Sequence, residues 1–144
     1  MLFEYSIKGG DFSTAGQASS RFKKVLQQLN VPPQTIKRIV IALYEAEVNI
    51  VAHAFEGTIN IEVQPGYVVM TLTDKGPGIP DIEKAMEVGY STASPKVREM
   101  GFGAGMGLSN IKNNADILEI QSKINQGTTL KITVNLNQEN VIKE

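Results

Sequence analysis

A carboxylate and an amide lie one helical turn apart near the middle of the sequence. Glu45 and Asn49 are four positions apart, so on a helix they share one face, with His53 one turn further along. A glutamate can take a proton from an attacking hydroxyl, and an amide oxygen suits a hard cation such as Mg²⁺. The same spacing is common on solvated helix faces, and His53 is interpreted as an ordinary helix residue rather than a catalyst.

A second polar motif, DKGPG over residues 74–78, directly follows an apolar run. A strand ending there would deliver the Asp74 carboxylate to the edge of a pocket, and Gly76 and Gly78 would let a flat ligand approach the backbone. The alternative is a tight turn, in which the glycines adopt positive φ and Asp74 caps its own backbone. The motif by itself leaves both interpretations open.

Glycine occupies every second position of a third segment, as Gly101, Gly103, Gly105 and Gly107. Backbone without side chains before a helix can bind phosphate, because its free N–H groups and the helix dipole both favour an anion. A flexible surface loop is the alternative, although each glycine costs up to about 1 kcal/mol in conformational entropy. The signatures GxxxxGK[ST] and GxGxxG are both absent.

The helices and strands that must position these residues follow from the spacing of the apolar residues. This spacing is mostly helical in the first part of the chain and mostly alternates in the later part. Helices followed by strands that tight turns connect indicate an α+β fold, a two-layer sandwich in which a mixed sheet carries helices on one face. We expect strands at 2–8, 58–64, 67–74, 117–123 and 128–136, and helices at 13–29, 33–57, 81–88 and 105–114.

Length and composition restrict the classes of protein. The chain has 144 residues, a net charge of −1 and no cysteine, which excludes disulfides, thiol nucleophiles and thiolate metal sites and argues against nucleic acid or anionic membrane as a partner. No apolar run approaches the roughly 20 residues that span a bilayer, and no secretory signal precedes the fold, so we expect a cytoplasmic protein. One domain over 1–136 with a polar tail at 137–144 is the simplest division.

Taken in chain order, these motifs and the Gly-Thr pair at 127–128 resemble those of the GHKL (Bergerat-fold) ATPases. The pattern EAxxNxxxHA over 45–54 is similar to that of the small bacterial anti-sigma-factor serine/threonine kinases and stress-response switch kinases, as are the segments 89–112 and 116–134. Histidine kinases fit less well, because Ala52 stands where they carry a basic residue.

The resemblance implies a role for each motif. Glu45 would be the general base and Asn49 a ligand of Mg²⁺. Asp74 would accept a hydrogen bond from the adenine amino group, and Thr128 would reach adenine through water. The implied ATP site also includes glycines. Gly76 and Gly78 belong to the Asp74 motif, and Gly78 would let the adenine ring pack on the backbone. Gly101, Gly103, Gly105 and Gly107 would form a lid over the phosphates.

The function that the resemblance implies is that of an ATP-dependent protein serine/threonine kinase in a partner-switching pathway. Its substrate would be a small antagonist protein of the anti-sigma-antagonist type, and a sigma factor or another effector would be a further partner. The alternative is an ATP-sensing binding module without phosphotransfer, although the retained Glu45 favours the kinase. The sequence leaves open whether the chain forms a homodimer.

Overall fold

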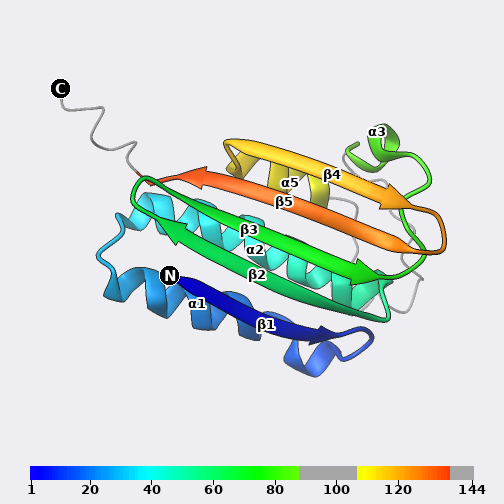
Figure 1. Ribbon diagram of the computed structural model, residues 1–144, viewed down its shortest axis with the longest axis horizontal. Coiled ribbons are helices and arrows are strands. Elements are labelled where there is room, and N and C mark those ends of the chain that lie inside the picture. Colours follow the sequence, from blue (N-terminus) through cyan, green and yellow to red (C-terminus); the bar gives the residue numbers. More distant parts are fainter. Residues whose placement is uncertain (88–106, 137–144) are drawn as a thin grey trace.

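A five-stranded sheet carries helices on one face in the computed structural model, which describes residues 1–87 and 107–136. Helices α1, α2 and α5 lie behind the sheet in Figure 1, and α3 lies beside the arrowhead end of β4. The predicted two-layer α+β sandwich is therefore confirmed. The elements are β1 (Leu2–Lys8), η1 (Phe12–Thr14), α1 (Gln17–Gln28), α2 (Pro33–His53), β2 (Glu56–Gln64), β3 (Tyr67–Lys75), α3 (Ile82–Ala85), α5 (Gly107–Asn114), β4 (Ile117–Lys123) and β5 (Gly127–Asn135).

The strand order is β1-β2-β3-β5-β4, and every neighbouring pair in the described sheet is antiparallel. The prediction of a mixed sheet was wrong in this respect. Strands β3 and β4, which α5 connects, do run in the same direction, but β5 lies between them, so they form no parallel pair (Figure 1). Because of this insertion, β3 ends and β5 begins at the same end of the sheet.

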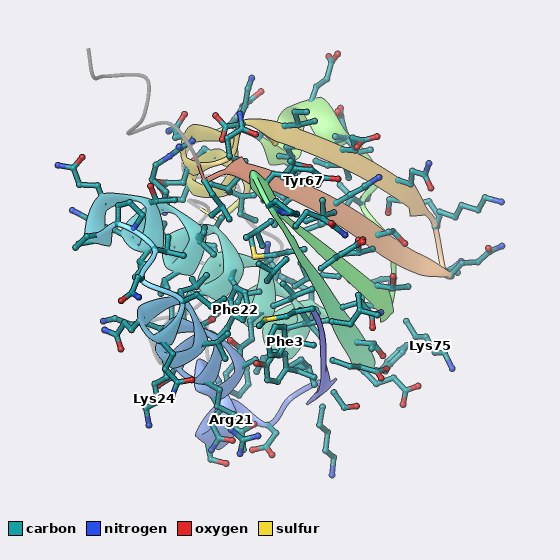
Figure 2. All side chains as sticks on the ribbon, turned by 60° about the vertical axis from the view of Figure 1, so that its left-hand side comes forward. Phe3, Arg21, Phe22, Lys24, Tyr67 and Lys75 are labelled. Carbon is teal, nitrogen blue, oxygen red and sulfur yellow. The ribbon has the colours of Figure 1, made fainter. Side chains whose placement is uncertain are left out.

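The core lies between α2 and the sheet. Ile39, Leu43 and Ala46 of α2 are fully buried, as are Met70 and Ile132 in the central strands. Of these, each isoleucine, leucine and methionine side chain contributes roughly 1.5–3 kcal/mol by leaving water. Toward the β1 edge, Phe3 and Phe22 join β1 to α1, with ring centroids 5.6 Å apart in an edge-to-face arrangement (Figure 2).

The helix predicted at 81–88 is shorter, since α3 spans only Ile82–Ala85. Two other predicted helices differ from the structure for local reasons. The helix predicted at 13–29 is divided into η1 and α1 by Gly16, whose φ is +93°. Helix α2 ends at His53 rather than near Gly57, because Ala54 is extended and the Phe55 N–H donates to the Lys75 carbonyl at 2.8 Å, which places the chain in the sheet.

Within residues 1–87 and 107–136, no helix is both long enough and apolar enough to cross a membrane. The cytoplasmic location stays a prediction. The predicted tail at 137–144 lies outside the described residues.

Candidate functional site

Glu45 and Asn49 lie on the side of α2 that packs against α5. The Nδ2 of Asn110 donates to Oε2 of Glu45 at 3.2 Å. A Cβ added to Gly107, the first residue of α5, would lie 3.1 Å from Oδ1 and 3.3 Å from Nδ2 of Asn49. The predicted pair therefore does share one face, and that face meets the beginning of the helix that follows the glycine-rich segment. We refer to Glu45, Asn49, Gly107 and Asn110 as the α5 end of the site.

Asp74 lies at the end of β3 and points to the helix-covered side of the sheet. Its Oδ1 accepts a hydrogen bond from the Thr128 N–H at 3.1 Å. Burial raises the pKa of Asp74 above its ordinary value, and the Thr128 N–H acts in the opposite direction. One carboxylate oxygen is thus held by the neighbouring strand, and no hydrogen bond from residues 1–87 or 107–136 reaches the other. Asp74 and Thr128, which were predicted separately, are brought into contact here.

Ser122 completes this polar group, although the sequence interpretation did not include it. Its Oγ accepts from the Ile79 N–H at 2.7 Å and lies 2.9 Å from Oγ1 of Thr128 and 3.2 Å from the Gly127 carbonyl. Ser122 is paired with Thr128 across β4 and β5, so the alternation of the two strands was the signal that could have found it. We refer to Asp74, Ser122 and Thr128 as the sheet end of the site.

Three glycines around the sheet end allow backbones to approach closely. A Cβ at Gly76 would lie 3.0 Å from Cα of Ala54, and one at Gly78, where φ is +81°, would lie 2.4 Å from the Lys123 carbonyl oxygen. At Gly127, where φ is +138°, it would lie 2.1 Å from the Asp74 carbonyl oxygen. The turn interpretation therefore accounts for Gly78, and the packing of a ligand ring on this glycine stays a prediction.

Helix α2 connects the two ends of the site. Ala54, which follows its last residue, contacts Gly76 beside Asp74, whereas Glu45 lies nine positions earlier. At a rise of about 1.5 Å per residue, that separation is roughly 13 Å along the helix. An elongated ligand lying along α2 could reach both ends, with a donor-rich group at Asp74 and an anionic group near Asn49.

Gly101, Gly103 and Gly105 lie outside the described residues. His53, the last residue of α2, has a pKa that burial lowers below its ordinary value. In the part of the chain that is described, no three acidic or histidine side chains gather as a metal site. A single amide oxygen from Asn49 still fits Mg²⁺, which often takes few protein ligands and completes its shell with phosphates and water.

Glu47, which the sequence interpretation left without a role, is a structural residue. It is fully buried, and its carboxylate accepts hydrogen bonds from the N–H groups of Gly16 and Ala18 and from both the N–H and the hydroxyl of Ser19. Helix α1 has no side-chain cap of its own. Glu47, which belongs to the neighbouring helix α2, therefore accepts hydrogen bonds from the free N–H groups at the beginning of α1 and places a negative charge at the positive end of its dipole.

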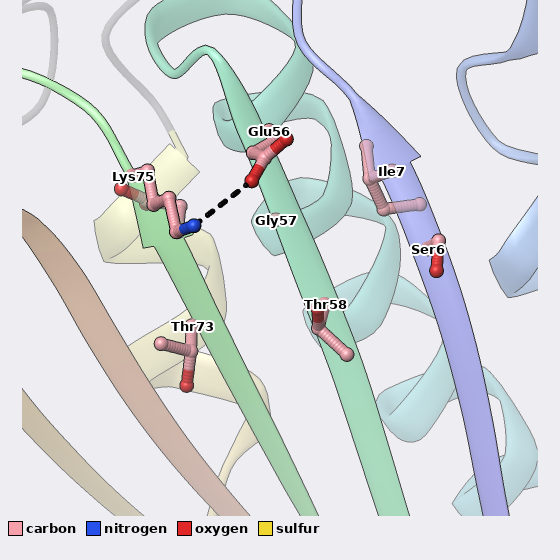
Figure 3. Close-up of a pocket in the computed structure, with 8 residues that line it drawn as sticks. Ser6, Ile7, Glu56, Gly57, Thr58, Thr73 and Lys75 are labelled. Carbon is pink, nitrogen blue, oxygen red and sulfur yellow. Dashed lines mark ion pairs between the residues drawn. The ribbon is translucent and has the colours of Figure 1, made fainter.

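A shallow pocket of about 270 Å³ lies elsewhere, across β1, β2 and β3 on the face without helices (Figure 3). Ser6, Thr58 and Thr73 line it, and Lys75 forms an ion pair with Glu56 at 3.2 Å at its rim. Glu45 and Asn49 do not line this pocket. Asp74 does line it, so the pocket includes one residue of the sheet end of the site and none of the α5 end.

Comparison with known sequences places the motifs in a family. Residues 11–134 match the model of the histidine kinase-like ATPase domain. The anti-sigma F factor of Clostridium botulinum is 32% identical over 143 residues, which cover 95% of this chain and 94% of that protein. The serine/threonine-protein kinase RsbT of Bacillus subtilis is 32% identical over 76% of this chain and 79% of that protein. The anti-sigma F factor of Geobacillus stearothermophilus is 29% identical over 90% and 88%.

Solved structures agree with the fold. The mycobacterial sensor histidine kinase MprB matches with a TM-score of 0.53 and 15% identity over 94% of this chain and 97% of that chain. The blue-light activated histidine kinase of Erythrobacter litoralis matches with a TM-score of 0.57 and 19% identity over 89% of this chain, which spans only 43% of that protein. At these identities the likeness concerns the fold alone.

Proposed function

The chain belongs to the histidine kinase-like ATPase domain family, and on that premise we propose that it is an ATP-dependent protein serine/threonine kinase of the anti-sigma-factor type. Two relatives bear the name anti-sigma F factor and one the name serine/threonine-protein kinase, each over most of the chain. The observation that carries the proposal concerns helix α2. Near Gly107 it carries a candidate general base, Glu45, and a candidate metal ligand, Asn49, and its other end lies beside the half-buried acceptor Asp74.

In this proposal the sheet end binds the base of ATP. The free oxygen of Asp74 accepts from the adenine amino group, and the Thr128 hydroxyl binds adenine through water. The Ser122 hydroxyl, bonded to the Ile79 N–H at 2.7 Å, fixes the loop that follows Asp74. A guanine carbonyl facing the same acceptors would leave them unpaired, which costs about 1–3 kcal/mol.

The α5 end binds the phosphates and positions the reacting groups. Mg²⁺, when bound, neutralises charge on the transferring phosphoryl group. Asn49 supplies an amide oxygen to that cation, and Gly107 lets the beginning of α5 approach Asn49. The proposed role of Gly101, Gly103 and Gly105 is to cover the phosphates. Glu45 takes the proton of the incoming serine or threonine hydroxyl.

The proposed substrate is a small antagonist protein of the anti-sigma-antagonist type, and the proposed further partner is a sigma factor. The names of two relatives support the sigma factor as a partner, because an anti-sigma factor is named for the factor it opposes. Self-association as a homodimer is compatible with the proposal and is not required by the site.

The test is transfer of label from γ-labelled ATP to a purified antagonist protein. We expect a stable phosphoprotein to form only with Mg²⁺ present. ATP binding without transfer to any antagonist would contradict the kinase and favour a module that senses ATP and changes its affinity for a partner. Absence of ATP binding would contradict the nucleotide site itself.

A further inference from the structure

Asn110 makes a contact with Glu45 that none of the sequence motifs assigns. It lies in the first turns of α5, and its Nδ2 donates to Oε2 of Glu45 at 3.2 Å in a partly buried position. Within residues 1–87 and 107–136, this is the one hydrogen bond recorded to the Glu45 side chain. The amide thus holds one carboxylate oxygen and leaves Oε1 to other groups.

The contact belongs to a regular match between two helices. Glu45 and Asn49 are four positions apart on α2, and Gly107 and Asn110 are three positions apart on α5, which are the spacings that place residues on one helix face. Asn49 lies against Gly107, and Glu45 binds Asn110. The beginning of α5 is therefore in register with both functional positions of α2.

We propose that Asn110 is a positioning residue for phosphotransfer, which holds the Glu45 carboxylate in the orientation that accepts the substrate proton. This role depends on the proposed function, because it requires Glu45 to act as the base. In the reaction, the acceptor hydroxyl oxygen bonds to the γ-phosphorus as the bond to the ADP oxygen breaks. The electron pair of that bond leaves with ADP, and the hydroxyl proton passes to Oε1 of Glu45.

The physical reason is the freedom of a glutamate side chain. Without a partner, Glu45 would sample several rotamers, and a base that is displaced by about 1 Å can lose roughly 100-fold in rate. One neutral donor on Oε2 restricts the carboxylate and leaves Oε1 as the proton acceptor. Because the donor comes from α5, the base is fixed relative to the helix that borders the phosphates.

The test replaces Asn110 by leucine, which keeps the shape of the side chain and removes the donor. We expect Asn110→Leu to lower kcat for phosphotransfer by about 10- to 100-fold while KM for ATP stays within about twofold. Asn114→Ala is the matched control, since Asn114 lies one turn later in α5 and its Nδ2 donates to the Asn110 carbonyl at 2.8 Å rather than to Glu45. This control should leave kcat unchanged.

A double-mutant cycle separates positioning from packing. If Asn110 acts through the base, Asn110→Leu lowers kcat in the wild-type background and has no further effect in a Glu45→Ala background. Equal effects in both backgrounds, an unchanged kcat, or a loss that appears in KM instead would overturn the proposal. Failure of the proposed function would appear already in the wild type as absent transfer, which would also remove the role assigned to Asn110.

A second double-mutant cycle, in which the unfolding free energy of the same variants is measured, tests the contact independently of activity. Losses that are not additive for Glu45→Ala and Asn110→Leu show that the hydrogen bond exists in solution. Additive losses would overturn the proposal even if kcat fell, because the two side chains would then not interact.

Discussion

The two ends of helix α2 are built by different means. At the sheet end, strand register brings Asp74, Ser122 and Thr128 together, and glycines allow backbone atoms to approach where a Cβ would lie as close as 2.1 Å. At the α5 end, two helices face each other, and one hydrogen bond from Asn110 reaches Glu45.

The difference shows which end depends on the backbone and which on side chains. Hydrogen-bonded strands and tightly packed turns form the sheet end before any ligand arrives, so that end suits recognition of a rigid base. The α5 end places a side-chain carboxylate and an amide beside a helix terminus, so it suits a group that reacts. Substitutions at the sheet end should therefore change folding and affinity, and substitutions of Glu45 and Asn110 at the α5 end should change turnover.

The largest expected effect is on turnover at the α5 end. Glu45→Gln keeps the size of the side chain and removes the base, so phosphotransfer should fall by roughly 10²- to 10⁴-fold. ATP binding should stay within a few fold of wild type. Label transfer and calorimetry on the same preparation measure both quantities, and transfer that survives the substitution would refute Glu45 as the base.

The next effect is on stability at the sheet end. Gly127→Ala introduces a Cβ 2.1 Å from the Asp74 carbonyl oxygen at a φ of +138°, so the unfolding free energy should fall by about 2–4 kcal/mol. Gly10→Ala is the matched control, because its φ is also positive, at +79°, but the space around it is open. Equal losses for the two variants in chemical denaturation would show that close approach at Gly127 is unimportant.

A smaller effect concerns the choice of nucleotide. Asp74→Asn replaces an acceptor by a group that also donates, so the preference for ATP over GTP should fall by roughly 10- to 100-fold. Asp81→Asn is the control, because Asp81 caps α3 by accepting from the Lys84 N–H and lies outside the site. Calorimetric titration that finds the same preference in Asp74→Asn as in the wild type would remove Asp74 from the site.

The smallest effect is the pH dependence of stability at Asp74. Because burial raises its pKa above the ordinary value of 3.8, the contribution of Asp74 to stability is complete below that value and is lost as the pH rises through the folded-state pKa. Asp74→Asn should therefore gain stability relative to wild type between acid and neutral pH. Denaturation curves across that range measure the difference, and a relative stability that moves the other way would contradict the burial of this carboxylate.

The sequence predicted the residues whose position depends on the local repeat of apolar side chains. Glu45 and Asn49 follow from the helical repeat, and Asp74 follows from the end of an alternating run. The tight turns expected between neighbouring strands are confirmed for the same reason in the β2–β3 and β4–β5 hairpins. These features need only neighbours along the chain.

The contacts that could not be predicted join segments far apart in the chain. Ser122 is 43 positions from Ile79, and Asn110 is 65 positions from Glu45. Neither pair can be found without the strand order and the packing of α5 on α2. Glu47 was missed for a related reason, because its role depends on the beginning of α1, which Gly16 sets by ending the first helical turn.

The most direct test of whether both ends bind one nucleotide is calorimetric titration of the wild-type protein with ATP and GTP, each with and without Mg²⁺. We expect ATP to bind more tightly than GTP, because the proposed role of Asp74 is to bind the adenine base. We expect Mg²⁺ to strengthen ATP binding, because Asn49 is the proposed ligand of the cation at the phosphates. Equal affinities for ATP and GTP, or ATP binding that is indifferent to Mg²⁺, would contradict the assignment of one end or the other.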